Sequence, residues 1–215
     1  MDFLPNSGAL GSRRTSAVDQ VYDLLLTAIV EGNLAAGHEL RDQVLAEHFG
    51  LSRTPIREAI KRLEHQGIVA VAAARYTRLV SFTIEQAEHV VRDWAAAHLT
   101  LVESLVHAAD RDTLSAMHTH HRTCRAGPEA RHIESSFRFF EHLRSASHSF
   151  SICLTASTAA YRHRLAAPLL PDPRDADLDL HTHILSALHE HDAADLASAF
   201  AGWQHAMRHP QPVGG

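Results

Sequence analysis

The sequence has few cysteines and lacks the local motifs that many enzyme classes require. Its two cysteines, Cys124 and Cys153, do not have the spacing of a metal-binding pair, which favours a protein of the reducing cytoplasm. It contains no HExxH motif, no glycine-rich phosphate loop, no dinucleotide-binding fingerprint and no Ser/His/Asp arrangement. The sequence therefore argues against an enzyme.

Long apolar runs are also missing. No stretch approaches the ~18–20 apolar residues that span a bilayer. Near the N-terminus, Arg13 and Arg14 follow a weak apolar segment, which is the reverse of the order in a secretory signal. We therefore expect a cytoplasmic protein with no membrane partner.

Charge is unevenly distributed along the chain. The net charge is −5, from 20 Lys and Arg against 25 Asp and Glu, and 19 histidines are counted as neutral. Within residues 52–78, however, only Glu58 and Glu64 oppose the basic side chains. Phosphate binding depends on such local fields, so the acidic total does not exclude a nucleic-acid partner. The basic residues of this stretch are Arg53, Arg57, Lys61, Arg62, Arg75 and Arg78.

The segment LAEHFGLSRTPIREAIKRLEHQG, residues 45–67, has the pattern of two short helices joined by a tight turn at Gly50. Ile56, Ile60 and Leu63 recur at helical spacing, which predicts that they face inward. The opposite face and the start of the second helix then present basic and hydroxyl side chains, as a helix that enters the major groove does. The candidate DNA-binding residues here are Ser52, Arg53, Thr54, Arg57 and Lys61.

The flanking segments complete a winged helix-turn-helix. An amphipathic pattern predicts a first helix over about 15–31. After Gly67, two apolar runs, 68–71 and 79–82, enclose a basic tip that contains Arg75 and Arg78. These runs predict a small β-hairpin, the wing.

From residue 83 onward the patterns are only helical. Helices are expected over about 84–106, 110–125, 133–147, 149–165, 176–191 and 192–209, with a loop at 168–175. We therefore predict a mainly α chain with a flexible tail (1–14), a winged helix-turn-helix domain (15–82), an all-helical antiparallel bundle that binds an effector and dimerises (83–209), and a second tail (210–215).

The motif SRTPIREAI followed by RLEHQGIV strongly resembles the N-terminal domain of GntR-type bacterial transcription regulators. The segments FEHLRSASHSF and HTHILSALHEHDAADLASAF are similar to the effector (FCD) domain of the FadR-like branch. The resemblance implies a ligand-responsive regulator, most often a repressor, that binds a double-stranded inverted-repeat operator as a homodimer. A small-molecule effector in the helical bundle would shift its affinity for DNA.

The resemblance also implies roles for single residues. Arg53 and Arg57 match recognition-helix arginines that contact guanine edges or phosphates, and Ser52 and Thr54 match hydroxyls that contact phosphates. In the wing, the glycine that usually follows the arginine is replaced by Tyr76. Arg75 and Arg78 can still reach phosphates.

Many FadR-like effector domains bind a metal through an Asp and a His at i, i+4 and two further histidines. Aligned on the resemblance, these positions are Arg138, His142, His181 and Trp203. A guanidinium has no lone pair to donate and would repel the ion. A family arginine on the first bundle helix falls on either Arg92 or Trp94.

Three alternatives follow for this pocket. In the first, Arg138, His142 and His181 bind an organic anion without metal, with Arg92 and Trp203 as further lining residues. In the second, His142 and His181 hold zinc or nickel together with His183, His205 or a residue of 118–121. In the third, the pocket is vestigial and Glu134, Glu141 or an acid on another helix neutralises Arg138.

Overall fold

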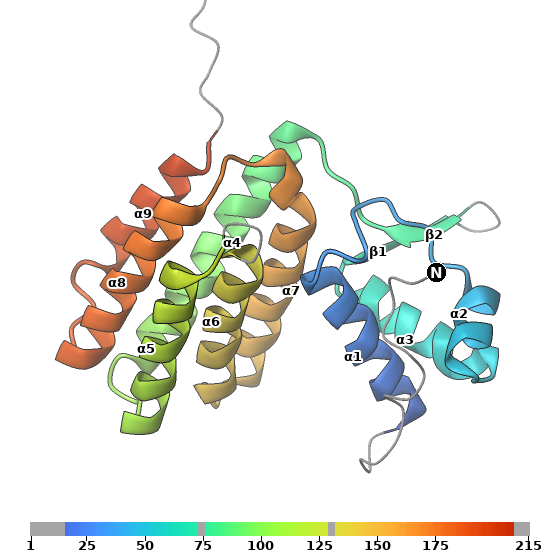
Figure 1. Cartoon of the computed structure of the whole chain (residues 1–215), viewed down its shortest axis with the longest axis horizontal. Helices are drawn as coiled ribbons and strands as arrows, with labels where there is room; N and C mark the ends of the chain where they lie inside the picture. Colours follow the sequence, from blue (N-terminus) through green and yellow to red (C-terminus); the bar gives the residue numbers. More distant parts are fainter. Residues whose placement is uncertain (1–15, 73–75, 129–131, 209–215) are drawn as a thin grey trace, which may run out of the picture. The chain divides into compact units, whose positions relative to one another are not determined.

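The computed structural model describes residues 16–72, 76–128 and 132–208 of the 215-residue chain. Internal contacts divide the chain into two compact units, Met1–Phe82 and Thr83–Gly215, called here the winged-helix unit and the helical unit. The predicted fold class, mainly α with a small β-hairpin after three helices, is confirmed (Figure 1). The predicted tails, 1–14 and 210–215, lie outside the described residues.

The winged-helix unit begins with the helices α1 (Ala17–Val30), α2 (Asp42–Phe49) and α3 (Arg53–His65). Gly50 follows α2 in the left-handed conformation, with φ 65°, and this turn lets α3 start after two residues. Both α1 and α2 pack on α3. Their buried faces form an apolar core that includes Val21, Leu25, Ile29, Leu45, Phe49, Ile56, Ala59 and Leu63.

The wing is an antiparallel pair of strands, β1 (Val69–Ala72) and β2 (Tyr76–Leu79), with Val69 opposite Leu79. The segment before α2 pairs with the other side of β2: the Leu40 N–H donates to the Thr77 carbonyl over 2.8 Å. Strand β2 is therefore hydrogen-bonded along both edges, which fixes the hairpin to the helices below it.

The predicted placement of the second strand was wrong. The apolar run at 79–82 indicated a strand there, but β2 ends at Leu79 and begins with the polar residues Tyr76 and Thr77. Leu79 is fully buried, whereas Ser81 is exposed. Backbone pairing with residues 38–40 places β2 in the basic part of the segment, a contact that period-two patterning cannot reveal.

The helical unit contains α4 (Ile84–Leu105), α5 (Arg111–Ala126), α6 (His132–Ala146), α7 (Phe150–Ala166), the 3₁₀ turn η3 (Ala167–Leu169), α8 (Arg174–Glu190) and α9 (Leu196–Ala206). A capping box between Thr83 and Gln86 starts α4. Helix α4 packs along α7 and α9, α5 packs along α6 and α8, and α8 packs along α9 (Figure 1). The largest fully buried side chains of this unit are Leu101, Met117, Phe139, Phe140 and Leu143.

Two helix boundaries differ from the predictions. Helix α9 begins at Leu196 instead of Asp192, because His191 adopts the left-handed conformation, φ 57°, and a turn follows it. The stretch 168–175 was predicted as a loop, but it contains part of η3 and the first two residues of α8. None of the helices in the described residues has both the length and the apolar character to cross a membrane.

Candidate functional site

The exposed face of α3 is basic. Arg53, Arg57 and Lys61 lie at i, i+4 and i+8, and side-chain exposure is 51% for Arg53 and 60% for Arg57. The opposite face of the same helix is buried through Ile56, Ala59, Ile60 and Leu63. The predicted division of this helix into a core face and a basic face is therefore present in the structure.

The start of α3 leaves its hydroxyl groups accessible. Ser52 is the N-cap residue but its side chain makes no capping hydrogen bond, and both Ser52 and Thr54 are exposed. The first N–H groups of a helix carry partial positive charge and suit an anion. This helix end, with its exposed hydroxyl groups, is chemically suited to a DNA phosphate.

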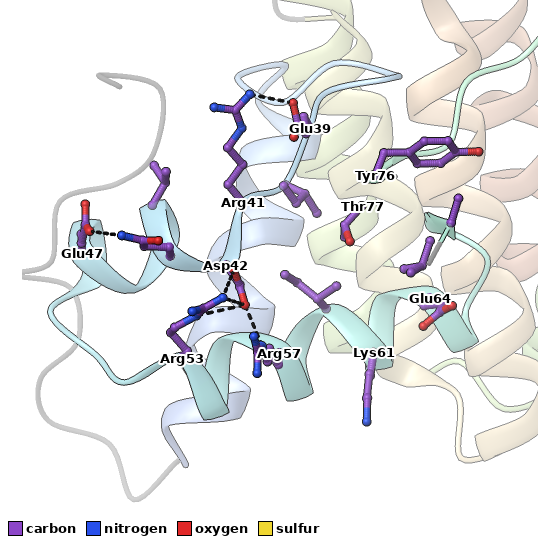
Figure 2. A pocket seen from close by; sticks show the side chains of 16 residues that line it. Glu39, Arg41, Asp42, Glu47, Arg53, Arg57, Lys61, Glu64, Tyr76 and Thr77 are labelled. Atoms are coloured by element: carbon purple, nitrogen blue, oxygen red, sulfur yellow. Dashed lines mark hydrogen bonds and ion pairs between the residues drawn. The ribbon is translucent and has the colours of Figure 1, made fainter. Parts of the chain in front are cut away.

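A carboxylate that sequence reasoning missed holds the two arginines. Asp42, the first residue of α2, accepts hydrogen bonds from Arg53 Nη2 (2.8 Å) and Arg53 Nε (3.2 Å) and from Arg57 Nε (2.6 Å). Figure 2 shows Arg53 and Arg57 converging on Asp42 from α3. One carboxylate thus joins α2 to two turns of α3.

The electrostatics of Asp42 favour its charged form. Partial burial raises the pKa of Asp42, but the hydrogen bonds from Arg53 and Arg57 outweigh this cost, and the pKa is lowered overall. The predicted helix pair began at Leu45 and so excluded Asp42 from the motif. The sequence did contain one signal for this residue. Asp42 lies three residues before Leu45, in the first turn of a helix, where a negative charge is favourable.

A groove of about 840 Å³ lies next to this ion-pair cluster, lined on one side by Arg53, Arg57 and Lys61 and on the other by Tyr76 and Thr77 (Figure 2). In the wing, the Arg78 guanidinium lies 4.1 Å from the centre of the Tyr76 ring, so the residue that replaces the expected glycine stacks on a basic side chain. Arg75 lies outside the described residues.

The structure does not bring the predicted effector residues of the helical unit together. Arg138 is exposed and pairs with Glu141 over 3.0 Å, the neutralising contact of the third alternative. The His142 ring lies 5.6 Å from that of His120. His181, in contrast, is fully buried.

The i, i+4 pair of α6 that does face His181 is Ser136 and Phe140. Ser136 Oγ lies 3.3 Å from His181 Nε2, and the rings of Phe140 and His181 are 5.4 Å apart. Ser136 and Phe140 lie two residues before the expected Arg138 and His142, and two residues turn a helical side chain by about 200°. Neither a serine hydroxyl nor a phenyl ring replaces the Asp and His of the metal pattern.

A buried carboxylate lies at the centre of this unit. Asp177 of α8, 5% exposed, accepts hydrogen bonds from Trp203 Nε1 (2.7 Å) and His132 Nε2 (3.0 Å). Burial raises the pKa of Asp177, but the His132 hydrogen bond and the other neighbours lower it overall. Burial lowers the pKa of His181 to about 3, so this ring is neutral at physiological pH.

Aromatic rings surround this carboxylate and leave a cavity of about 30 Å³, enough for one or two water molecules. Trp94 and Trp203 are 4.2 Å apart, and each also approaches the His163 ring. The family arginine on the first bundle helix was expected to fall on Arg92 or Trp94. Trp94 is buried and lines the cavity, whereas Arg92 is exposed, so only Trp94 lies at this site. Arg164 is the cation in the cavity wall.

The metal alternative finds no support in this geometry. Among the described residues, no group of three or more His, Cys, Asp and Glu side chains is arranged to hold a metal ion. His142 of α6 lies beside His120 of α5, whereas His181 of α8 contacts a different face of α6. His142 and His181 therefore do not form the expected pair of ligands.

Three helices with a basic recognition helix, a tight turn at Gly50 and a β-hairpin define a winged helix-turn-helix DNA-binding domain. Residues 17–78 match the family "Bacterial regulatory proteins, gntR family", which is less than a third of the chain. The predicted GntR resemblance is therefore confirmed for this part of the chain, which has the fold of a DNA-binding domain.

Curated relatives support the same assignment. The chain is 28% identical over 98 residues to an uncharacterized HTH-type transcriptional regulator, YdhC, of Bacillus subtilis, a match that covers 46% of this chain and 44% of the relative. It is 36% identical over 56 residues to a probable D-xylose utilization operon transcriptional repressor of Paenarthrobacter nicotinovorans, covering 26% of this chain and 25% of the relative. The chain thus spans less than half the length of these relatives.

Solved structures share the fold over most of the chain. The likeness to E. coli McbR/YncC has a TM-score of 0.71 at 21% identity and covers 89% of this chain and 94% of that one. A putative transcriptional regulator GntR from Rhodococcus sp. RHA1 gives a TM-score of 0.64 at 18% identity, covering 90% and 100%. These likenesses show the fold: a winged helix followed by a helical bundle.

Proposed function

We propose that the protein is a ligand-responsive transcription regulator that binds an inverted-repeat DNA operator as a homodimer and acts as a repressor. The observation that carries this proposal is the row of Arg53, Arg57 and Lys61 on the exposed face of α3, within a domain of the gntR family. One curated relative is named as a repressor of a sugar-utilisation operon, which is consistent with the proposed sign of regulation.

Direct DNA binding is the first test. Duplexes selected from a randomised pool should contain two half-sites about one helical turn apart, because a two-fold dimer presents two copies of α3. Fluorescence anisotropy with a selected duplex should then give tight binding that weakens steeply with added salt. Selection of unrelated sequences with no repeated half-site would contradict the dimeric model.

For the dimer, we propose that two copies meet through the exposed face of α7 and the adjacent part of α4. Phe150 and Leu154, one turn apart on α7, have relative exposures of 81% and 42%. A groove of about 560 Å³ beside Leu154 is lined by small residues of α4 and α7 and by Asp93 and Arg162, a pair of opposite charges that a two-fold partner can match.

A Leu154→Asp variant tests this face. Sedimentation equilibrium should show a dimer for the wild type and a monomer for the variant, because the added carboxylate would be buried between the copies. Thr100→Asn, a polar change within the same groove, should leave a measurable fraction of dimer. An unchanged dimer in Leu154→Asp would place the contact elsewhere.

For the effector, we propose that residues 83–209 bind a small organic molecule in the cavity between Trp94 and Trp203. An acidic group on the ligand would face Arg164, and Asp177 favours a ligand that also carries a hydrogen-bond donor. Because the cavity holds only about 30 Å³, binding must move at least one of the surrounding rings.

Tryptophan emission provides a direct measurement. The chain contains two tryptophans, and both line this cavity. Titration with a panel of small carboxylates and amino acids should identify compounds that change the emission and also change operator affinity. The metal-responsive alternative predicts instead a change with zinc or nickel alone, after treatment with a chelator.

A further inference from the structure

Asp42 and the two arginines of α3 form a unit whose geometry leaves specific atoms free. The carboxylate occupies the side edge of each guanidinium group: Nε and Nη2 of Arg53, and Nε of Arg57. Within the residues that the structure describes, no hydrogen bond reaches Nη1 of Arg53 or either terminal nitrogen of Arg57. The outward end of Arg57 thus keeps both terminal nitrogens, and that of Arg53 keeps Nη1 and the second N–H of Nη2.

The arrangement also fixes where these donors lie. Arg53 and Arg57 are one turn apart on α3, and an unrestrained arginine side chain has many rotamers. By accepting hydrogen bonds from both Nε atoms, Asp42 restricts the rotamers of both side chains at once. The side-chain exposures agree with this arrangement: Asp42 is 24% exposed, whereas Arg53 and Arg57 are 51% and 60% exposed. The carboxylate thus lies beneath the two guanidinium groups.

The free edges match a specific partner. The two terminal nitrogens of a guanidinium can donate together to O6 and N7 of guanine, a bidentate contact made in the major groove. A DNA phosphate would instead compete with Asp42 for the same cations, and a negative charge at this position disfavours that exchange. The ion-pair cluster therefore penalises contact with phosphate alone and retains contact with guanine edges.

We propose that Asp42 is a specificity-determining residue that positions Arg53 and Arg57 to read guanine bases and suppresses their binding to phosphates of non-cognate DNA. This inference rests on the proposed DNA-binding function and adds to it a positioning role on a different helix from the recognition helix. Asp42 itself does not need to contact DNA.

The test compares Asp42→Asn with a matched control. Asp19→Asn changes the net charge by the same amount and removes another carboxylate–arginine pair of the winged-helix unit, Asp19 with Arg62 at 3.0 Å, which lies outside the groove. Asp42→Glu, which keeps the charge, serves as the conservative variant. Circular dichroism and thermal melting of each variant establish that it is folded.

For each protein, anisotropy gives the affinity for a selected duplex and for a scrambled duplex of equal length and composition. We expect Asp42→Asn to lower the ratio of the two affinities about ten- to hundredfold, the size of one or two base contacts, partly by strengthening binding to the scrambled duplex. Asp19→Asn should keep the ratio within about threefold of wild type, and Asp42→Glu should keep most of it.

A chemical probe on the DNA separates guanine contact from phosphate contact. Replacement of half-site guanines by 7-deazaguanine removes the N7 acceptor and should weaken wild-type binding about tenfold or more per contacted base, but weaken Asp42→Asn binding by much less. If Asp42→Asn keeps the wild-type ratio, or if 7-deazaguanine has no effect on a wild type that does bind specifically, the role of Asp42 is overturned while DNA recognition stands. A wild type without any preferred sequence overturns the DNA-reading function itself.

Discussion

The Trp203 indole donates its Nε1–H to Asp177 over 2.7 Å, which ties α9 to α8 through a carboxylate that is almost fully buried. The second oxygen of Asp177 is bonded to His132 of α6. Three helices of the bundle therefore converge on one side chain. A buried charge of this kind is tolerated only while its partners are in place, so its removal should be costly.

Asp177→Ala should destabilise the helical unit by about 3–5 kcal/mol, because it leaves the His132 and Trp203 donors buried without an acceptor. Urea unfolding followed by circular dichroism measures the loss. Asp179→Asn is the control on the same helix: its side chain is 80% exposed, and its change should remain within about 0.5 kcal/mol. Equal stabilities of the two variants would contradict the central role of Asp177.

Stability should fall as the pH is lowered below about 6.5. Burial lowers the pKa of His181 from 6.5 to about 3, and desolvation lowers that of His163 to about 4, while burial also places the pKa of His98 well below 6.5. Since the unfolded chain binds these protons more readily, the stabilisation is full above pH 6.5 and is lost as the pH falls toward the folded values. By pH 5, His181 alone should cost about 2 kcal/mol.

Urea midpoints at pH 7, 6 and 5 test this dependence. His181→Phe should reduce the slope of stability against pH by about one proton, or about 1.4 kcal/mol per pH unit, whatever its effect on stability at pH 7. His183→Asn, at an exposed position two residues further along α8, should keep the wild-type slope. A slope unchanged in both variants would show that His181 does not titrate on unfolding.

Arg53→Ala should abolish specific retention of the operator. Loss of one bidentate base contact costs about 1–3 kcal/mol, and a dimer loses it in both half-sites. Gel shift or anisotropy with a selected duplex is the measurement. Arg138→Ala, which removes an exposed arginine of the helical unit, should bind as the wild type does.

Lys61→Ala should weaken binding to all sequences alike, because Lys61 lies one turn beyond Arg57 on the exposed face and carries a charge that can meet a phosphate. The slope of log affinity against log salt concentration should fall by about 0.9 for each phosphate that the variant no longer neutralises. A Lys61→Ala variant with wild-type salt dependence but altered sequence preference would instead assign base contact to this residue.

The winged-helix unit was predictable because its signals are local. The apolar face of α3, the glycine turn and the basic exposed face all follow from spacing within a few residues, and the structure has them where they were expected. Asp42 was not found, because its link to Arg53 spans 11 residues and joins two helices, and no period describes such a pair. The wing was displaced for a similar reason, since residues 38–40 determine the position of β2.

The effector residues were harder because a helix turns by about 100° per residue. Arg138 and His142, the residues expected from the resemblance, lie on other faces of α6 than the buried Ser136 and Phe140, which face His181. His181 and Trp203 are both buried: Trp203 donates to Asp177, and His181, one turn after Asp177 on α8, contacts Ser136 and Phe140. The three phenylalanines of α6 do not by themselves define which face of the helix contacts His181, because all three are buried. That face depends on the position of α8, which the sequence of α6 does not contain.

The ion pairs of Asp42 also bear on protein engineering. Recognition helices are often exchanged between scaffolds as self-contained cassettes, but here the carboxylate that aligns Arg53 and Arg57 belongs to α2. A graft of α3 alone would leave that partner behind, and the arginines would regain their rotational freedom. The smallest transferable module is therefore residues 42–65, which contain α2, α3 and the turn at Gly50 with its left-handed conformation.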